Sequence, residues 1–255
     1  MALHIHILPV LKDNYVYLLH DDASGNTAAV DPSLAKPVLA ALKKKGWQLT
    51  HILCTHHHWD HTGGNLELKA ETGCVVVGYA DDAHRIPGID VRLEEGESYN
   101  FGSHAAQMLF IPGHTLGHIA YYFAEEKLLF CGDTLFSMGC GRLFEGTPEQ
   151  MYHSLSKLAA LPDDTKVYCG HEYSEANGHF ALTLEPHNRD LQARMEEVKR
   201  QRGQSLPTLP STIGMEKRTN PFLRTQSAAI QKNLGLKGED SVKIFAELRR
   251  RKDDF

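Results

Sequence analysis

The sequence predicts an α/β fold with mixed sheets, followed by a smaller helical region. Short apolar runs separated by turn signals fill the first two thirds of the chain. Some runs follow one another directly, as in hairpins, and others are joined by helical patterns, so both kinds of strand pairing are expected. After residue 173 the pattern changes to long amphipathic segments. We therefore expect one domain over residues 1–172 and a helical domain over residues 173–255.

Strands are expected where apolar residues alternate or run together between turn residues. In chain order these segments are 4–10, 14–20, 27–31, 50–55, 74–79, 107–113, 119–125, 127–133 and 166–173. Apolar residues at helical spacing predict helices at 36–46, 63–73 and 147–161. Gly46 suits the end of the first of these helices, and Thr147 suits the N-cap of the third.

The C-terminal third predicts a different arrangement. Helical patterns cover residues 185–203, 227–235 and 239–254. The segment between the first two, residues 204–224, is rich in proline and is expected to be extended.

Composition excludes several classes of partner. A net charge of −5 argues against general binding to nucleic acid or to an anionic membrane. No apolar run approaches the roughly 20 residues that span a bilayer, and the N-terminus does not resemble a signal peptide. We therefore expect a cytoplasmic protein. The five cysteines form no C-x-x-C pair, so a disulfide framework or thiolate zinc site is not expected.

Histidine is unusually frequent, with 16 residues, and four of them lie in "THHHWDHTGGN" at residues 55–65. In an extended segment His56 and His58 point the same way, while Asp60 and His61 follow where a helix can begin. Histidine is the commonest protein metal ligand. The cluster therefore indicates a metal site, with a polar surface loop or a single structural metal as the alternatives.

Three further apolar runs end in residues of ligand type. They lead to His114, Asp133 and His171, and each of these follows a glycine that permits a sharp turn or a close approach. Ligand sites in α/β folds collect at the carboxyl ends of strands. The sequence therefore predicts that these three residues complete the site begun at residues 56–61.

The motifs T-H-x-H-x-D-H, P-G-H-T-x-G-H, G-D-T-L-F and C-G-H-E-Y together resemble the ligand series of the metallo-β-lactamase superfamily. Within it, "LKDNYVYLL", "GCGRLFEGT", "NPFLR" and "LRRRKDDF" resemble the hydroxyacylglutathione hydrolases, the glyoxalase II family. The resemblance implies an αββα sandwich of two mixed sheets as the catalytic domain. It also implies that the small helical C-terminal domain contributes to glutathione binding.

The resemblance implies two divalent metal ions. One ion is held by His56, His58 and His114, the other by Asp60, His61 and His171, and Asp133 bridges them. Zinc is the expected metal, and iron or manganese would also suit imidazole and carboxylate ligands. A hydroxide that bridges the metals is expected to attack the thioester carbonyl, with Asp60 helping to orient it. Asp31 and His118 are expected to support the ligands without binding the metals.

The implied substrate is a glutathione thioester such as S-D-lactoylglutathione, hydrolysed to D-lactate and glutathione in methylglyoxal detoxification. The resemblance assigns Arg249 and Lys252 to the glycine carboxylate of glutathione, with Arg142 and Tyr173 contributing from elsewhere. Many family members have lysine in place of Arg142 and tyrosine in place of Phe144, so these contacts differ in geometry. Without the resemblance, "RRRK" at residues 249–252 reads as a solvated helix end.

Three other functions compete with this one. A persulfide dioxygenase with one iron would not need Asp60, His61 and His171 together. A phosphodiesterase acting on RNA is disfavoured by the negative charge. A non-catalytic, metal-stabilised binding module would normally have a closed four-coordinate site, not seven ligands. We expect a small-molecule substrate and a monomeric protein.

Overall fold

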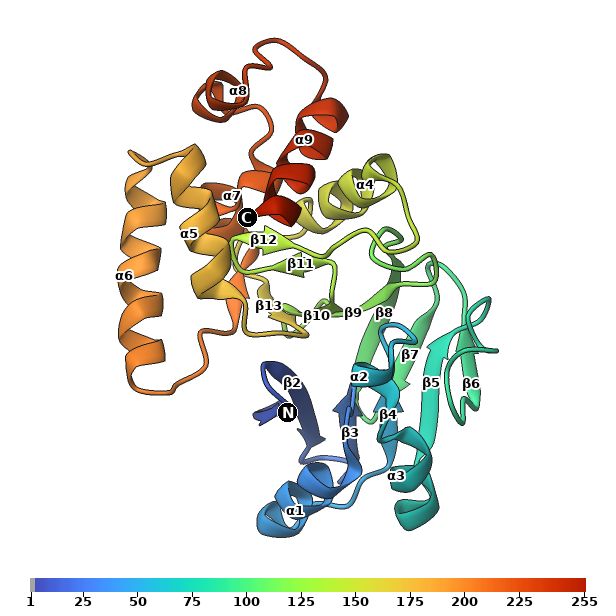
Figure 1. Cartoon of the computed structure of the whole chain (residues 1–255). Coiled ribbons are helices and arrows are strands. Elements are labelled where there is room, and N and C mark those ends of the chain that lie inside the picture. The colour runs from blue at the N-terminus through green and yellow to red at the C-terminus, as the bar shows by residue number, and fades with distance from the viewer. Residues whose placement is uncertain (1–2) are drawn as a thin grey trace. The chain divides into compact units, whose positions relative to one another are not determined.

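A computed structural model describes residues 3–255 of the chain, which divides into two compact units (Figure 1). Unit 1 comprises Met1–Phe110 and Gly117–Gly132, and its described part begins at Leu3. Unit 2 comprises Ile111–Leu116 and Asp133–Phe255.

The first sheet of unit 1 combines antiparallel and parallel pairing. Its strands, in spatial order, are β1 (Leu3–Val10), β2 (Asn14–Asp21), β3 (Thr27–Val30), β4 (His51–Leu53), β5 (Val75–Tyr79) and β6 (Val91–Leu93). The first three strands are antiparallel, and β3 to β6 are parallel. The expected mixture of hairpins and helix-connected strands is therefore confirmed for this sheet.

A second, antiparallel set of strands faces the first sheet. In unit 1 its order is β10 (Leu128–Gly132), β9 (Ile119–Phe123), β8 (His104–Phe110) and β7 (Ser98–Phe101). Tyr17 of β2 packs on Phe130 of β10, with ring centroids 5.5 Å apart. The Tyr121 hydroxyl of β9 donates to the carbonyl oxygens of Cys54 and Val77. These contacts tie the inner faces of the two sheets together.

Helices cover the other face of the first sheet. They are α1 (Ala35–Lys45) and α3 (Asn65–Thr72), which lie beside each other in Figure 1, whereas the short helix α2 (Trp59–Thr62) follows the end of β4. Side chains alternate along a strand, so Val16 and Leu18 of β2 pack with Val38 and Leu42 of α1, whereas Tyr17 points to the opposite sheet. Successive residues of β2 therefore fill the two opposite faces of the first sheet.

Unit 2 begins with short strands and one capped helix. Its first elements are β11 (Leu135–Phe136), β12 (Gly139–Cys140), α4 (Pro148–Ala159) and β13 (Lys166–Cys169). Thr147 accepts a hydrogen bond from the Gln150 amide, and the Gln150 side chain accepts one from the Thr147 amide. This reciprocal cap confirms the helix start that the sequence predicts.

The helical part of unit 2 contains α5 (Ser174–Leu184), α6 (Arg189–Gly203), α7 (Ile213–Thr219), α8 (Ala228–Leu234) and α9 (Ser241–Asp254), with β14 (Ser211–Thr212) and the short 3₁₀ helix η1 (Pro221–Leu223). Figure 1 shows α5 and α6 side by side. A Cβ at Gly178 of α5 would overlap the sulfur of Met195 in α6. Glycine therefore permits the close approach of these helices.

The prediction of an extended segment at residues 204–224 is wrong in part. Residues 213–219 form α7, whose N-cap is Thr212, a residue that accepts a hydrogen bond from the Met215 amide. The prolines that suggested an extended chain lie before and after this helix, where they do not interrupt its hydrogen bonds. Within residues 3–255, no helix is both long and apolar enough to cross a membrane.

A buried ion pair joins α5 to the segment after η1. Arg224 donates two hydrogen bonds to the Glu185 carboxylate, at 2.8 and 2.9 Å, and the Ser227 hydroxyl donates a third at 2.6 Å. Burial raises the pKa of Glu185, but the hydrogen bonds from Arg224 and Ser227 outweigh it, so the pKa lies below its ordinary value. The carboxylate is therefore stabilised in its charged form.

Arg224→Ala is expected to lower the free energy of unfolding by about 2–3 kcal/mol at pH 7, because it leaves a buried carboxylate without its cation. The folded-state pKa of Glu185 is depressed, so the contribution is present above the unfolded pKa of roughly 4.3 and is lost as the pH falls through the folded-state value. Denaturant unfolding at pH 7 and at about pH 3 should show the difference between variant and wild type shrinking in acid. Arg218→Ala, which removes an exposed arginine 3.9 Å from Asp190, is the control and should change stability little.

Candidate metal centre

The histidine cluster follows β4 and is held in place by two glycines. The chain passes from β4 through Thr55 to α2, which contains Asp60 and His61. A Cβ at Gly63 would approach the Ser33 carbonyl oxygen to 2.7 Å, and one at Gly64 would approach the Pro32 carbonyl oxygen equally closely. The turn after α2 therefore requires glycine at both positions.

A hydrogen-bonded relay fixes the ring of His56. The Asp31 carboxylate accepts from the Thr55 amide at 2.7 Å and from the Thr55 hydroxyl at 2.6 Å. Because that hydroxyl proton is directed to Asp31, Thr55 Oγ1 accepts from Nδ1 of His56, 3.0 Å away. His56 is therefore left with a lone pair on Nε2, which lies 3.2 Å from Nδ1 of His58.

Asp31 also orients His61. Oδ2 of Asp31 lies 3.2 Å from Nδ1 of His61, which donates to it and leaves Nε2 as the basic nitrogen. That Nε2 lies 3.6 Å from Oδ2 of Asp60. Asn14 in turn donates to the same Asp60 oxygen at 3.0 Å and to the Asp60 carbonyl oxygen at 3.1 Å. These hydrogen bonds thus fix the orientation of the His61 and Asp60 side chains.

These separations suit metal ligands. Two nitrogen or oxygen ligands at about 2.0–2.1 Å from one tetrahedral ion lie roughly 3.4 Å apart. The pairs His56–His58 and Asp60–His61, at 3.2 and 3.6 Å, match that spacing. The ligand-type atoms of Asp31, His56 and His61 also lie within 4.8 Å of one another. Asp31, however, is already engaged by Thr55 and His61, which fits a supporting role.

His118 and His57 flank the cluster in unit 1. The buried His118 ring stacks on His56 with centroids 4.6 Å apart, and its Nδ1 lies 3.1 Å from the Ile119 carbonyl oxygen. Nδ1 of His57 lies 3.2 Å from Oδ2 of Asp82. A glycine at residue 132 is required here, because a Cβ would overlap Thr55 and contact His118, and because its φ of 47° is left-handed.

The second group of ligand-type residues lies in unit 2. Oδ2 of Asp133 lies 3.5 Å from Nε2 of His114 and 3.2 Å from Nε2 of His171. Nδ1 of His114 donates to the Arg142 carbonyl oxygen at 2.8 Å, which leaves Nε2 as the basic nitrogen. All three side chains are buried. One carboxylate oxygen thus faces two imidazoles, at the spacing expected of ligands that share ions.

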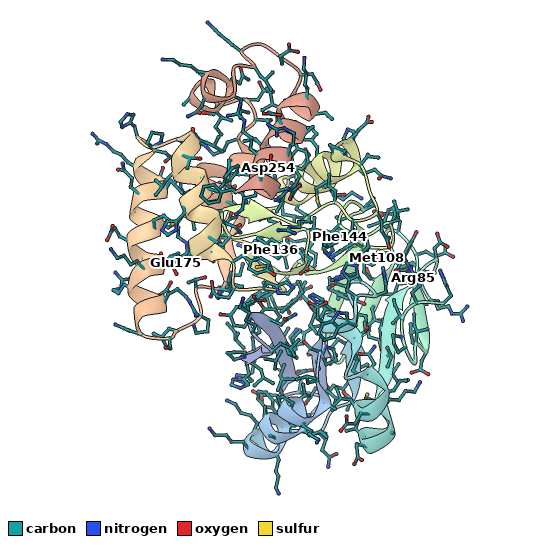
Figure 2. All side chains as sticks on the ribbon, viewed as in Figure 1. Arg85, Met108, Phe136, Phe144, Glu175 and Asp254 are labelled. Atoms are coloured by element: carbon teal, nitrogen blue, oxygen red, sulfur yellow. The ribbon has the colours of Figure 1, made fainter. Side chains whose placement is uncertain are left out.

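Aromatic side chains pack on both of these histidines. Tyr173 stacks on His171 with centroids 4.8 Å apart and an interplanar angle of 3°. Phe144, labelled in Figure 2, meets the His114 ring edge-on at 5.2 Å, and 64% of its surface is exposed. Phe144 and Tyr173 therefore lie directly beside ligand-type residues, and both remain accessible to a small molecule.

The cationic residues of unit 2 differ in accessibility. The Arg249 side chain on α9 is only 6% exposed, and its Nη1 donates to the Cys140 carbonyl oxygen at 2.8 Å. Arg142, in contrast, has 66% of its side chain exposed. The Lys252 ammonium lies over the rings of Phe180 and Phe255, at 5.5 and 5.1 Å. Arg249 is thus part of the packing of α9 against residues 140–141, which its position in a charge run did not reveal.

Burial raises the pKa of the Cys140 thiol to about 11, although the neighbouring Arg249 guanidinium opposes this shift. The reactive form of cysteine is the thiolate. Cys140 is therefore protonated at neutral pH and does not serve as a nucleophile. Burial likewise raises the pKa of the Cys54 thiol.

Asn14, Thr55 and Asp82 support the unit 1 cluster, although the sequence alone assigns no role to them. Asp82 is 3% exposed in its side chain and pairs with Arg85 at 2.5 Å, as well as with His57. None of the three stands in the sequence at a position that a metal-ligand motif would occupy. Only the position of Thr55 next to His56, and of Asn14 in the "LKDNY" motif, offered a signal in the sequence.

Asn14→Ala is expected to weaken metal binding by about tenfold, because the Asp60 carboxylate loses the amide that orients it. The measurement is the metal dissociation constant from chelator competition, with the absorption spectrum of the cobalt-substituted protein as a second readout. Asn100→Ala, at an exposed position of β7, is the matched control. Unchanged dissociation constants in Asn14→Ala would contradict the orienting role.

Comparison with known proteins finds similar proteins that match over nearly the whole chain. Residues 22–171 match the family model of the metallo-beta-lactamase superfamily, and residues 172–255 match the model for the hydroxyacylglutathione hydrolase C-terminus. A hydroxyacylglutathione hydrolase of Methylococcus capsulatus is 59% identical over 253 residues, which cover 99% of each chain. One of Rhodospirillum rubrum is 56% identical over 254 residues, covering 100% of this chain and 99% of that one.

Solved structures with the same fold include ETHE1 from Myxococcus xanthus, with a TM-score of 0.66 and 26% identity over 99% of this chain and 98% of that one. The B3 metallo-beta-lactamase BLEG-1 has a TM-score of 0.67 and 24% identity over 87% of this chain and 100% of that one. The expected fold of two sheets flanked by helices, with a helical C-terminal region, is confirmed.

Proposed function

Because the chain belongs to the hydroxyacylglutathione hydrolases of the metallo-β-lactamase superfamily, we propose that it hydrolyses S-D-lactoylglutathione and related 2-hydroxyacylglutathiones to the hydroxy acid and glutathione. The enzyme is a thioester hydrolase. High identity to hydrolases of this name over the whole chain, C-terminal region included, is the observation that supports this function best. The alternatives of a persulfide dioxygenase and a phosphodiesterase are not favoured.

The His and Asp clusters indicate a binuclear metal site. We propose that His56, His58 and His114 hold one ion, that Asp60, His61 and His171 hold the other, and that Asp133 is shared. The ligand-type atoms within each unit support this assignment, since their pairs are spaced as ligands of one ion are. Zinc is the metal we propose, and imidazole with carboxylate ligands also accepts iron or manganese.

Two divalent ions, when bound, acidify a water to hydroxide near neutral pH and polarise the thioester carbonyl. The protein contributes orientation. Asp31 and Thr55 keep protons on Nδ1 of His61 and His56, so Nε2 of each ring stays available as a base. Asn14 fixes the Asp60 carboxylate, which we propose helps to orient the attacking hydroxide. Packing of His118 on His56 limits ring rotation.

The leaving group needs little assistance from the protein. A thiol pKa lies near 8.5, so the glutathione thiolate departs without a dedicated general acid. Cys140 is buried and protonated, so a covalent thioester exchange through it is not part of the proposed mechanism. Hydrolysis therefore proceeds by direct attack of hydroxide on the carbonyl carbon, with release of thiolate and carboxylic acid.

We propose that the glutathione moiety is bound by Arg142, Phe144, Tyr173, Arg249 and Lys252. Exposed aromatic surface at Phe144 and Tyr173 beside the ligand histidines supports contact with the substrate there. The cationic side chains supply charge for its carboxylates. Because Arg249 is buried, its contribution combines charge with support of residues 140–141.

The two family-model matches meet at residues 171 and 172, which supports a catalytic domain over residues 1–172 and a glutathione-binding helical domain over residues 173–255. We further propose a monomer in the cytoplasm, with a small-molecule substrate and without a nucleic-acid or membrane partner. The net charge of −5 supports the exclusion of nucleic acid.

The decisive experiment follows thioester absorbance with S-D-lactoylglutathione while the metal content of the same preparation is counted. Hydrolysis by protein containing close to two metals per chain is the expected result. Absence of turnover in such protein would reject the substrate assignment. A phosphodiester substrate and glutathione persulfide, tested in parallel, should not be converted.

A further inference from the structure

Four charged side chains of unit 2 lie together at the end of α9. The carboxylate oxygen Oδ1 of Asp253 lies 2.9 Å from Nη2 of Arg249 and 3.8 Å from Nε of Arg142. Lys252 is adjacent in sequence. Within residues 3–255, Asp253 is the one carboxylate paired with Arg142 or Arg249, and it also attracts the Lys252 ammonium, which lies over two aromatic rings. Three cations therefore share a single internal anion.

The excess positive charge affects Lys252. Burial lowers the pKa of Lys252, and the nearby Arg249 and Arg142 guanidinium groups lower it further. A second anion at this position would relieve that repulsion. The net positive charge of the cluster therefore favours binding of an external carboxylate.

Arg249 does not depend on Asp253 to keep its place. Its Nη1 donates to the carbonyl oxygens of Cys140, at 2.8 Å, and Gly141, at 3.5 Å, and its guanidinium lies 5.3 Å from the ring centroid of Phe222. Asp253, in contrast, has 45% of its side chain exposed and lies one turn further along α9. Ion pairs between residues four apart on a helix contribute little to stability. Asp253 can therefore leave without disturbing the arginine.

We propose that Asp253 is an internal counter-ion that the substrate carboxylate displaces from Arg142 and Arg249. The inference rests on the proposed function for the identity of the ligand, a glutathione thioester. Asp253 neutralises part of the cationic cluster in the free enzyme and swings toward solvent when the ligand binds. It thereby weakens binding of anionic ligands and acts on KM, because it changes the charge that binds the ligand carboxylate and not the groups that act on the thioester.

The test replaces Asp253 with asparagine, which keeps the shape of the side chain and removes its charge. D253N should bind glutathione about two- to fivefold more tightly than wild type, the effect typical of one partly exposed charge at close range. Calorimetry measures this dissociation constant without any need for turnover. KM for S-D-lactoylglutathione should fall by the same factor, with kcat unchanged. At about 1 M salt, where the screening length is about 3 Å, the difference should disappear.

Two controls isolate the position and the ligand group. Asp254, labelled in Figure 2, is one residue further along α9, is 72% exposed and pairs with Arg250 at 2.9 Å. D254N removes the same charge and should leave glutathione affinity unchanged. Glutathione ethyl ester, in which the glycine carboxylate is blocked, should bind wild type and D253N alike. Melting temperatures of both variants show whether the fold is retained.

The outcomes separate this inference from the proposed function. Weaker or unchanged glutathione binding by D253N would overturn it, since Asp253 would then support Arg249 or have no effect. Absence of glutathione binding by both proteins would overturn it as well. If wild type hydrolysed no glutathione thioester and D253N still bound glutathione more tightly, the proposed function would fail and the counter-ion role would stand. If wild type hydrolysed the thioester and D253N kept the same glutathione affinity, the proposed function would stand and the counter-ion role would fail.

Discussion

Asp133→Ala is expected to abolish thioester hydrolysis, with a loss in kcat/KM of more than about 100-fold, the upper loss typical of residues that only support a metal ligand. One oxygen of Asp133 lies 3.5 Å from Nε2 of His114 and 3.2 Å from Nε2 of His171. Its removal withdraws a negative charge from two imidazoles at once. The expected cause of the lost activity is therefore loss of metal, and not a change in the chemical step alone.

Metal content and activity must be measured on the same preparation of Asp133→Ala. Circular dichroism should show a retained fold, because the substitution removes a polar group without overpacking the core. Glu175→Ala is the matched control, since Glu175 is an exposed carboxylate on α5 of the same unit, labelled in Figure 2. A variant that kept both ions and near-normal kcat/KM would exclude Asp133 as a shared ligand. Loss of activity with full metal content would instead indicate a role in the chemical step.

Much of the fold was predictable because strong local signals agree with the final packing. The runs "NYVYLL" and "THILCT" contain the apolar residues that fill both faces of the first sheet, and they became β2 and β4. Thr147 and Gln150 form the reciprocal cap that begins α4. Where propensity, pattern and capping point the same way, a single sequence is sufficient.

Other elements depend on tertiary contacts that leave little local trace. β7 reads "SYNF", with a polar residue at an exposed edge position, and its pairing with β8 is visible only in the folded chain. The α5 sequence contains Gly178, which weakens a helical pattern but is needed for the approach of Met195. The glycine that obscures α5 is therefore explained by Met195, a residue of the next helix.

The candidate site likewise contains residues that the sequence identifies and residues that only the folded chain reveals. His56, His58, Asp60 and His61 stand in one motif, so the sequence is sufficient to predict that these ligand-type side chains form one cluster. Asn14 could not be assigned, because its contact with Asp60 joins residues 46 positions apart. Asp82 is likewise 25 positions from His57. Ligand-type residues form a recognisable motif, whereas the residues that hydrogen-bond to them come from whichever element the fold brings near.

Arg249→Ala is expected to raise KM for S-D-lactoylglutathione by about tenfold or more, the loss expected for hydrogen bonds that involve a charged group. The sequence alone attributes this effect to one lost contact with the substrate. The burial of Arg249 predicts a second effect. Without its donors to the carbonyl oxygens of Cys140 and Gly141, the segment that leads to Arg142 loses its anchor on α9. KM should therefore rise together with a measurable fall in melting temperature.

Arg249→Lys and Lys252→Ala separate the two effects. Lysine at residue 249 keeps the charge but cannot hold two carbonyl oxygens with a planar fork, so stability should fall while part of the affinity returns. Lys252→Ala removes a cation that lies over two aromatic rings and makes no hydrogen bond to residues 140–141, so it should raise KM with a smaller change in stability. Because the cations are proposed to act on substrate binding, kcat should change little in all three variants. A large drop in kcat with unchanged KM in Arg249→Ala would contradict a role in binding. It would show instead that the packing of α9 on residues 140–141 controls the orientation of the His114 ring, through its hydrogen bond to the Arg142 carbonyl.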